Sequence, residues 1–474
     1  MMTTSQWLES EAPVLALRGL AEHTDEVEPG YGFVCVTSDD ARRESFVAQA
    51  ESRGAKAVLV ESAGSLVTEL PVFEIEQLST SRGHLAAQFY GEPSQQVRCI
   101  GITGTNGKTS VAFHIADLLT RLGHKTGYMG TLGWGLLNAL HDPNLTTGNA
   151  VALQRRLAHL RDLGCEAVAI EISSHALDQK RAHDVEIEIA LFTNLSRDHL
   201  DYHKTMDAYA SAKARLFSDF RIRLAVLNAD EVNFKPTLAA DTKVCRYGRD
   251  ADWYWRSQGT AHARQLISWR TPFGGFSAQL DVVADYVLDN ITAALAVVSE
   301  FTGGIDGFAD ALQSLCPVPG RMQIVSQGNG RPHVAIDYAH TPDALDKVLS
   351  AGRKFCGGRL ICVVGCGGDR DRGKRSQMAQ VAQRLSDAVW LTSDNPRWES
   401  PDAIIADMLE GVDQGAALHV CVDRSLAIHA AIESATPRDL VLIAGKGHEA
   451  YQEISGTKHP FSDETVARHA LGGH

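Results

Sequence analysis

A single glycine-rich stretch carries the clearest chemical signature in the sequence. Residues 101–110 run Gly-Ile-Thr-Gly-Thr-Asn-Gly-Lys-Thr-Ser. An apolar run at 96–100 precedes the stretch and an amphipathic run at 111–119 follows it, which predicts a strand, a loop and a helix in succession. Backbone N–H groups in such a loop approach an anion closely, Lys108 adds a full positive charge, and the Thr109 hydroxyl is suited to ligate Mg²⁺. The stretch therefore favours a phosphate-binding loop over an ordinary strand-to-helix turn.

Polar side chains follow the next predicted strands. Glu171 comes directly after the apolar run 167–170, and a carboxylate beside a phosphate loop is well placed to hold Mg²⁺. His199 lies in the charged segment 194–203, where a metal or substrate role and a structural role are equally favoured. Lys213 lies on a helix with one apolar face, and this pattern alone predicts a solvated lysine.

Four apolar runs in the last third of the chain, at 334–336, 360–364, 388–392 and 440–444, each lead into a polar loop. In open parallel sheets the ligand binds at the carboxyl edge of the strands, so these loops are predicted to meet at one site. Any one charged residue there could instead form a surface ion pair. Because basic and acidic residues occur together at the strand ends, however, they predict a zwitterionic or polyanionic ligand. The candidates are Arg321, Asp337, His340, Arg370, Asp394, Arg397, Lys446 and Glu449.

Positioning these residues requires alternating strands and helices, which predicts an α/β protein with mostly parallel sheets. We expect three domains: a small N-terminal α/β module at 1–95, a central parallel-sheet domain of the P-loop ATPase type at 96–316, and a C-terminal Rossmann-like domain at 317–474. A segment at 253–280, rich in Trp, Thr and Ser, is predicted to be a hairpin excursion. A linker is predicted at 317–320.

Composition narrows the class of protein. The formal net charge of −13 argues against a nucleic-acid or anionic-membrane binder. The 9 cysteines are scattered and form no CxxC pair, which is typical of a reducing compartment. Neither a signal peptide nor a membrane-spanning run is apparent. We therefore expect a cytoplasmic enzyme, monomeric, acting on small anionic molecules.

The ordered motifs resemble those of the Mur ligase family, the amide ligases of peptidoglycan precursor synthesis, from about Arg98 to Phe461. The resemblance is greatest to the members that add the third residue of the peptide. Because so many motifs occur in the family's order, the resemblance is specific. The matching segments are 103–109, 145–148, 171–175, 193–203, 320–322, 337–345, 365–375, 394–397 and 445–449.

The resemblance implies ATP and Mg²⁺ as cofactors. It implies catalytic roles for Lys108, Glu171, His199 and Lys213. Thr109, Glu171 and His199 would ligate metal, together with a carbamate on Lys213, and this implication replaces the expectation of a solvated lysine. The nucleotide would be bound by Gly104, Thr105, Asn106, Gly107, Lys108, Thr109, Ser110, Asn290, Arg321 and Asp337.

The implied reaction joins meso-diaminopimelate to UDP-N-acetylmuramoyl-L-alanyl-D-glutamate through an acyl phosphate, a step on which cell wall biogenesis, cell shape and cell division depend. The muramoyl dipeptide would be held by Thr146, Thr147, Ser173, Gln179 and Arg181. In relatives that use diaminopimelate the loop at 394–397 is Asp-Asn-Pro-Arg, as it is here, and relatives that use lysine lack the arginine. The incoming amino acid would be held by Arg370, Asp394, Asn395, Arg397, Gly445 and Glu449.

Three departures from the family pattern leave alternatives open. The family's Asp-Ser-Arg motif, which helps bind the uridine nucleotide, is replaced at 24–30 by a stretch whose acidic residues would repel phosphates. The family's Phe-Asn pair is replaced near 286–287, and Trp398 stands where a small polar residue is common. One alternative is a Mur-type ligase that acts on a different carboxylate substrate. A non-catalytic ATP-binding regulator is a third hypothesis, which the intact Lys108, Glu171, His199 and Lys213 disfavour.

Overall fold

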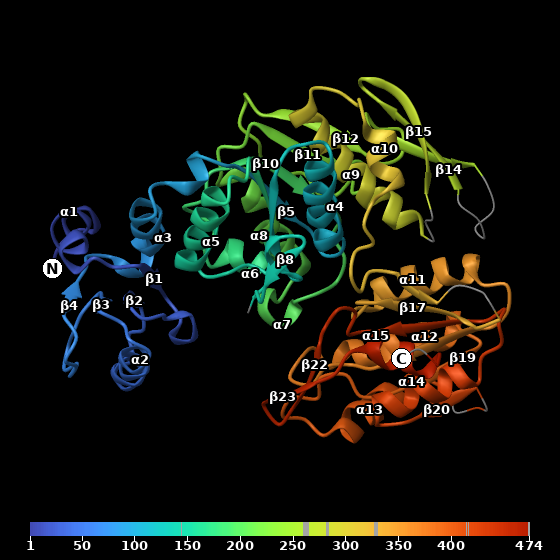
Figure 1. Cartoon of the computed structure of the whole chain (residues 1–474). Helices are drawn as coiled ribbons and strands as arrows, with labels where there is room; N and C mark the ends of the chain where they lie inside the picture. Colours follow the sequence, from blue (N-terminus) through green and yellow to red (C-terminus); the bar gives the residue numbers. More distant parts are fainter. Residues whose placement is uncertain are drawn as a thin grey trace.

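The chain forms three successive α/β bodies, each built around its own sheet. The computed structural model describes residues 1–143, 145–258, 265–280, 284–326, 330–413, 415 and 417–472. Figure 1 shows the N-terminal body (blue) at one end, the central body (cyan to yellow) in the middle, and the C-terminal body (orange to red) beside it. The predicted α/β class with three domains is confirmed.

The N-terminal body is a small parallel sheet with the strand order β1-β2-β3-β4. Its strands are β1 (Gly19–Ala21), β2 (Tyr31–Cys35), β3 (Ala57–Val60) and β4 (Val72–Glu74), and its helices are α1 (Thr4–Leu15), α2 (Asp40–Ser52) and α3 (Leu78–Phe89). A short 3₁₀ helix, η1 (Thr24–Glu26), holds the stretch that departs from the family motif.

The central sheet has the order β12-β11-β10-β5-β9-β6-β7-β8, parallel except for the antiparallel edge β7 and β8. Its strands are β5 (Arg98–Thr103), β6 (Thr126–Gly130), β7 (Gly133–Leu136), β8 (Ala139–His141), β9 (Ala167–Glu171), β10 (Ile187–Phe192), β11 (Leu224–Asn228) and β12 (Lys243–Tyr247). One face packs on α4 (Lys108–Arg121) and α9 (Asp285–Thr302), the other on α5 (Ala150–Asp162), α6 (Ser174–Asp178) and α8 (Met206–Ser218). A short helix, α7 (Leu200–His203), precedes α8. Burial on both faces explains why the strands are almost uniformly apolar.

The predicted excursion is an antiparallel sheet of β13 (Tyr254–Gln258), β14 (Gln265–Thr271) and β15 (Gly274–Leu280). It packs on α9 and on α10 (Phe308–Gln313), and Trp269 Nε1 donates a hydrogen bond to Thr292 Oγ1 at 3.0 Å. The excursion therefore covers the helix that follows it.

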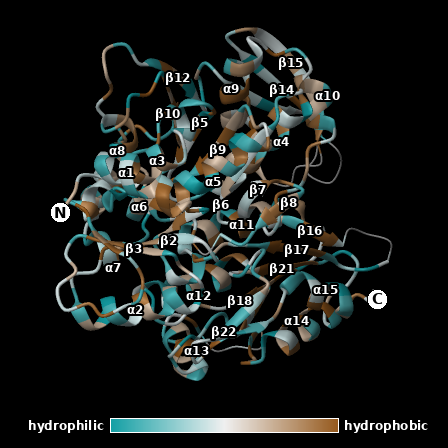
Figure 2. Ribbon diagram, turned by 60° about the vertical axis from the view of Figure 1, so that its left-hand side comes forward, coloured by the Kyte–Doolittle hydropathy of each residue, from teal (hydrophilic) through white to brown (hydrophobic). Residues whose placement is uncertain are grey.

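The C-terminal sheet has the order β16-β17-β21-β18-β19-β20, with only the edge strand β16 antiparallel among the described strands. Helices cover both faces, and Figure 2 shows hydrophobic residues concentrated in the strands between them. Its strands are β16 (Gln323–Ser326), β17 (His333–Asp337), β18 (Leu360–Val364), β19 (Ala388–Leu391), β20 (Leu418–Val420) and β21 (Leu440–Ala444). Its helices are α11 (Pro342–Phe355), α12 (Gly373–Leu385), α13 (Pro401–Leu409), α14 (Arg424–Glu433) and α15 (Asp463–Ala470).

A two-stranded hairpin, β22 (Tyr451–Ile454) and β23 (Thr457–Pro460), follows β21 and lies against the loop after β19. Among the described residues, no helix has both the length and the hydrophobicity needed to cross a membrane.

Candidate active site

The glycine-rich stretch is a tight loop between β5 and α4. Gly104 has φ +146°, and a Cβ there would lie 1.8 Å from Thr193 Oγ1. Gly107 has φ +87°, and a Cβ there would lie 2.5 Å from Asn290 Oδ1. Both the left-handed backbone and the close neighbours require glycine at these positions. The loop is therefore pressed between the end of β10 and helix α9.

Lys108 folds back over this loop. Its Nζ donates hydrogen bonds to the carbonyl oxygens of Gly104 at 2.9 Å and Thr105 at 2.8 Å. Burial lowers the pKa of Lys108, while Glu171 and Asp198 act in the opposite direction. The ammonium group is stabilised here by the partial negative charges of these carbonyl oxygens and by more distant carboxylates. An anion bound on the loop would provide a full negative charge beside it.

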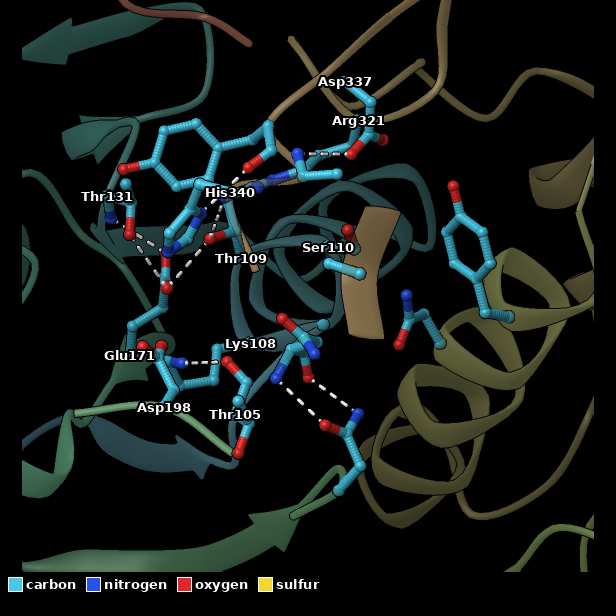
Figure 3. Close-up of a pocket in the computed structure, with 18 of the residues that line it drawn as sticks. Thr105, Lys108, Thr109, Ser110, Thr131, Glu171, Asp198, Arg321, Asp337 and His340 are labelled. Carbon is cyan, nitrogen blue, oxygen red and sulfur yellow. Dashed lines mark hydrogen bonds between the residues drawn. The ribbon is translucent and has the colours of Figure 1, made fainter. Parts of the chain in front are cut away.

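Glu171, at the end of β9, is fully buried and held by four donors. Its Oε1 accepts from Tyr128 Oη at 2.5 Å and Thr131 N at 2.8 Å, and its Oε2 accepts from Thr131 Oγ1 at 3.2 Å and Thr109 Oγ1 at 2.9 Å (Figure 3). A carboxylate in this network keeps one orientation, facing the first turn of α4.

The donor set at this point fits Mg²⁺. The Thr109 hydroxyl and the Glu171 carboxylate are hard oxygen donors in direct contact, and both line the cavity over the phosphate loop. His199 lines the same cavity. Within the described ranges, no three His, Cys, Asp or Glu side chains converge to form a metal centre by themselves. A complete metal site would therefore need donors of other kinds. The predicted ligand set includes two such donors, the Thr109 hydroxyl and a carbamate on Lys213.

His199 and its neighbour Asp198 lie between the phosphate loop and the C-terminal domain. His199 has φ +54°, and its Nε2 lies 3.4 Å from Asp198 Oδ2. Burial lowers the pKa of His199 to about 4, so the imidazole is neutral and available as a ligand. Burial alone would raise the pKa of Asp198. The nearby His199, His340 and Lys374 have a larger, opposite effect, so the pKa of Asp198 is lowered.

Lys213 is not a solvated lysine, so the prediction from its helix alone is wrong. The side chain is 1% exposed, and Nζ donates to the Gly104 carbonyl at 2.7 Å. Nζ also lies 4.2 Å from the centroid of the Tyr209 ring. Burial, reinforced by the nearby Lys108, lowers the pKa of Lys213 well below its ordinary value. A neutral buried amine is the form that reacts with carbon dioxide.

The C-terminal domain closes one side of the phosphate-loop cavity. Arg321 Nη2 donates to Thr109 Oγ1 at 3.0 Å, and Asp343 Oδ2 accepts from Asn106 Nδ2 at 3.2 Å. Asp337 accepts from the backbone N–H groups of Met322 and Ala339, and burial raises its pKa to about 6 against the opposing charge of Arg321. Figure 3 shows Arg321 and Asp337 entering this cavity from the side opposite Glu171.

The cavity brings together the predicted nucleotide residues, except that Gly104 is not part of its wall. It has a volume of about 250 Å³. Thr105, Asn106, Gly107, Lys108, Thr109, Ser110, Asn290, Arg321 and Asp337 all line it. Lys213 lies behind the loop rather than on the wall of the cavity.

The residues predicted to hold the muramoyl dipeptide cluster around the end of β9, but only part of the set faces a cavity. Thr146 and Ser173 line the phosphate-loop cavity. Thr147 Oγ1 donates to the Glu171 carbonyl at 2.8 Å, and Arg181 donates to the Thr147 carbonyl. Gln179 is exposed and reaches Tyr202 Oη at 3.4 Å. Thr147 and Arg181 therefore shape this edge through its backbone.

All six residues predicted to bind the amino acid line a second cavity, of about 410 Å³. It lies at the carboxyl ends of β18, β19 and β21. Five residues line both cavities, so the two share a wall made of Thr146, Asp198, His199, Tyr338 and His340. His340 is held there by a 2.9 Å hydrogen bond between its Nδ1 and the Tyr338 carbonyl. The predicted residues of the second cavity are Arg370, Asp394, Asn395, Arg397, Gly445 and Glu449.

Two buried cations support the second cavity. Lys446 was among the candidates from the sequence, whereas Arg375 was not predicted as part of the site. Lys446 is fully buried, and its Nζ donates to Asn395 Oδ1 and to Glu449 Oε2, both at 2.9 Å. Arg375 is also fully buried and pairs with Glu399 and Asp407, both at 2.7 Å. Both cations lie inside the matched motifs 445–449 and 365–375, so the signal was present, but Asn395, Glu399 and Asp407 come from other segments.

The altered stretch in the N-terminal domain is less repulsive than its sequence predicted. Glu26 Oε2 lies 3.1 Å from Arg155 Nη2, and Glu26 Oε1 lies 3.5 Å from Arg156 Nη2, so two cations of α5 neutralise it. Asn149 Nδ2 also donates to Glu26 at 3.3 Å. Thr24 is buried and its hydroxyl donates to Gln49 Oε1 at 3.2 Å. The contacts of Glu26 with Arg155, Arg156 and Asn149 join the N-terminal domain to the central domain.

Comparison with known proteins gives a consistent result over nearly the whole chain. Residues 102–298 match the model of the Mur ligase middle domain, and residues 320–447 match that of the Mur ligase glutamate ligase domain. The chain is 41% identical over 473 residues to the UDP-N-acetylmuramoyl-L-alanyl-D-glutamate–2,6-diaminopimelate ligase of Xylella fastidiosa, covering 97% of this chain and 95% of that protein. It is 42% identical to the enzyme of that name from Xanthomonas campestris over 463 residues, covering 96% and 93%.

Solved structures agree. A structure of a UDP-N-acetylmuramoyl-L-alanyl-D-glutamate–2,6-diaminopimelate ligase aligns with a TM-score of 0.64 and 36% identity, covering 96% of this chain and 95% of that one. The MurF ligase of Thermotoga maritima in complex with ADP aligns with a TM-score of 0.69 at 18% identity, covering 92% and 95%, and shows the shared fold.

Proposed function

The chain belongs to the Mur ligase family, and we propose that it is an ATP-dependent ligase that joins meso-diaminopimelate to UDP-N-acetylmuramoyl-L-alanyl-D-glutamate in peptidoglycan precursor synthesis. The observation that carries this proposal is the wall shared by the two cavities. A phosphate-binding site and a site lined by cations and anions meet there, as a reaction that activates a carboxylate and then adds an amino acid requires.

The first step activates the D-glutamyl carboxylate, because a carboxylate anion does not acylate an amine. The carboxylate oxygen attacks the γ-phosphorus of ATP, and ADP leaves. Lys108 and Arg321, which both line the cavity over the phosphate loop, are proposed to stabilise the charge on the transferring phosphoryl group. When bound, Mg²⁺ supplies further neutralisation of phosphate charge. Its proposed ligands are Thr109, Glu171, His199 and a carbamate on Lys213.

The second step joins the amine to the acyl phosphate across the shared wall. The amine of the incoming amino acid attacks the acyl carbon, and the tetrahedral intermediate collapses to an amide and inorganic phosphate. Arg370 is proposed to bind the carboxylate beside the reacting amine, and Arg397 the distal carboxylate. Glu449, fixed by Lys446 and Asn395, is proposed to accept the distal ammonium group.

The contacts between domains support a role in excluding water. An acyl phosphate hydrolyses if water reaches it, and Arg321 and Asp343 already bridge the C-terminal domain to the phosphate loop. We assign residues 1–95 to the nucleotide sugar, 96–316 to ATP and the carboxylate, and 317–474 to the amino acid. We further propose that the enzyme acts as a monomer in the cytoplasm.

Release of phosphate by the purified protein tests the proposal. Release should require ATP, the UDP-muramoyl dipeptide and diaminopimelate together, and each phosphate should accompany one amide. Lys108→Ala should abolish release while leaving the melting temperature near that of the wild type, and the exposed Lys235→Ala serves as the matched control. ATP turnover that ignores the two co-substrates would contradict the assignment.

A second candidate function deserves the same assay because of one observation. The family's Asp-Ser-Arg motif is absent, and η1 instead contributes Thr24 and a neutralised Glu26. A ligase of this family that acts on a different carboxylate substrate would release phosphate with diaminopimelate only when that other carboxylate replaces the UDP-muramoyl dipeptide.

A further inference from the structure

The hairpin β22–β23 lies directly behind the loop that carries Arg397. Arg397 N donates to the Glu453 carbonyl at 3.0 Å, and Ser455 N donates to the Arg397 carbonyl at 2.6 Å. Arg397 has φ +53°, a left-handed conformation that residues with a Cβ rarely adopt. Pairing on both sides of this residue holds the unusual backbone, so the hairpin fixes where the Arg397 side chain begins.

The same hairpin also holds the guanidinium group. Glu453 Oε2 lies 3.4 Å from Arg397 Nε, and Arg397 Nη1 donates to the Gly368 carbonyl at 2.7 Å. Arg397 lines the amino-acid cavity, whereas Glu453 and Gly368 are not among the residues of its wall. Two groups outside the cavity wall therefore hold the guanidinium group, and its remaining N–H groups are available to a ligand in the cavity.

Trp398 braces the turn of the hairpin. Its side chain is 76% exposed and it is not part of the cavity wall, so it does not crowd the amino-acid site. A Cβ at Gly456 would lie 2.6 Å from Trp398 Cζ2, and Gly456 has φ +75°. The turn thus rests against the indole ring, and the close approach requires glycine at position 456.

We propose that Glu453 is a positioning residue for Arg397, and that the hairpin braced by Trp398 thereby helps to select diaminopimelate over lysine. This inference rests on the proposed function of the amino-acid cavity. Diaminopimelate differs from lysine by a carboxylate beside its distal amine, and only that carboxylate needs a correctly aimed guanidinium group.

The electrostatics favour such an arrangement. An arginine side chain has many rotamers, and ordering it on ligand binding costs conformational entropy. A partner that already holds the side chain in the free enzyme reduces that cost. Glu453 supplies an anion that stays with Arg397 when the cavity holds no amino acid. Since Glu453 approaches Nε and Gly368 approaches Nη1, a ligand carboxylate at Nη2 adds a partner without displacing either.

Steady-state kinetics on the full-length enzyme test this role. We expect Glu453→Ala to raise the KM for diaminopimelate about tenfold, with kcat and the KM values for ATP and the UDP-muramoyl dipeptide within about twofold of wild type. Glu453→Gln, which keeps the shape and an acceptor but not the charge, should give a smaller rise. The slow reaction with lysine should be unchanged. His459→Ala, on the exposed strand β23, is the matched control.

A double-mutant cycle with Arg397→Ala separates positioning from general damage. If Glu453 acts through Arg397, adding Glu453→Ala to Arg397→Ala should have no further effect on diaminopimelate turnover. Additive losses, or equal losses with lysine and diaminopimelate, would overturn the inference. Should Glu453→Ala fail to fold, Glu453→Gln carries the same cycle. A wild-type enzyme that ligates no diaminopimelate at all would overturn the proposed function as well, so the two failures are distinguishable.

Discussion

Arg321, at the start of the C-terminal domain, donates a hydrogen bond to the hydroxyl of Thr109 in the phosphate loop, at a distance of 3.0 Å. The contact joins two domains at the point where the nucleotide and the metal are proposed to bind. The Arg321 guanidinium carbon also lies 4.3 Å from the centroid of the Tyr338 ring, which orients the side chain towards the loop.

Replacing Arg321 should therefore damage catalysis more than folding. We expect Arg321→Ala to lower kcat/KM for ATP by about 100-fold, as the loss of a charged group at a transferring phosphoryl group typically does. The melting temperature should change little. The exposed Arg331→Ala is the control, and a variant that keeps near-normal turnover would remove Arg321 from the ATP site.

Lys213 should be required in a modified form. Lys213→Ala is expected to lose most activity while remaining folded, and Lys213→Arg should not restore it, because a guanidinium group does not form the carbamate. Intact-protein mass spectrometry under native conditions with bicarbonate should show one added carbon dioxide on the wild type and none on Lys213→Ala. An unmodified, fully active enzyme in bicarbonate-free buffer would contradict this role.

Asp337 gives a prediction for stability against pH. Burial raises its folded-state pKa to about 6, above the ordinary value near 3.8, so the folded state binds the proton more tightly than the unfolded state. Its contribution is fully present below about pH 4 and is lost as the pH rises through about 6. Wild type should lose roughly 3 kcal/mol of unfolding free energy from this group over that range.

Urea unfolding of the wild type and Asp337→Asn at pH 4 and pH 7 measures that loss. The variant cannot titrate at this position, so its stability relative to wild type should improve as the pH rises. Asp343→Asn, at a partly exposed carboxyl group in the first turn of α11, is the control. A constant difference between wild type and Asp337→Asn would show that the pKa is not raised.

Binding of the nucleotide sugar should depend on the neighbours of Glu26 more than on Thr24. The Thr24 hydroxyl is committed to Gln49, so Thr24→Ala should change the affinity for the UDP-muramoyl dipeptide by about twofold or less. Arg155→Ala should weaken that affinity about tenfold, because it leaves the buried Glu26 less neutralised next to the domain boundary. Isothermal titration calorimetry distinguishes these outcomes, and a large loss in Thr24→Ala would give that residue the role of the family's serine.

Selection of the amino acid should reside in Arg397. We expect the wild type to prefer diaminopimelate over lysine by on the order of 10³-fold, since lysine has no distal carboxylate to accept from the N–H groups of Arg397 that Glu453 and Gly368 leave free. Arg397→Ala should lose mainly diaminopimelate activity and narrow that ratio. Competition between the two amino acids in one reaction, analysed by mass spectrometry, measures the ratio directly, and equal use of both by the wild type would refute the assignment.

The sequence predicted the phosphate loop and many of the apolar strands of each sheet, but not short or edge strands such as β4, β8 and β20. Five-residue apolar runs that end in polar loops are characteristic of strands buried on both faces, and the runs at 360–364 and 440–444 became neighbouring strands β18 and β21. The residues predicted for the amino acid converge on one cavity because parallel strands end at a common edge.

Contacts between distant segments were beyond the sequence. Lys213 appeared solvated because its helix has one apolar face, but its amine is buried against the Gly104 carbonyl of the phosphate loop. Glu26 appeared repulsive because its partners, Arg155 and Arg156, lie on another domain. Trp398 stands where a small polar residue is common, and no local pattern reveals that its indole ring lies outside the wall of the amino-acid cavity.

The narrow wall between the two cavities has a consequence for how such an enzyme changes over evolutionary time. Most of the residues proposed to make the acyl phosphate belong to the central domain, although Arg321 and Asp337 come from the start of the C-terminal domain. The loops proposed to choose the amine follow strands of the C-terminal sheet. Only a few residues, such as Asp198 and His340, belong to both sites. Substitutions in the loops that bind the amino acid can therefore accumulate without matching changes in the residues that activate the carboxylate. The choice of amino acid can thus change during evolution while the chemistry of activation stays the same.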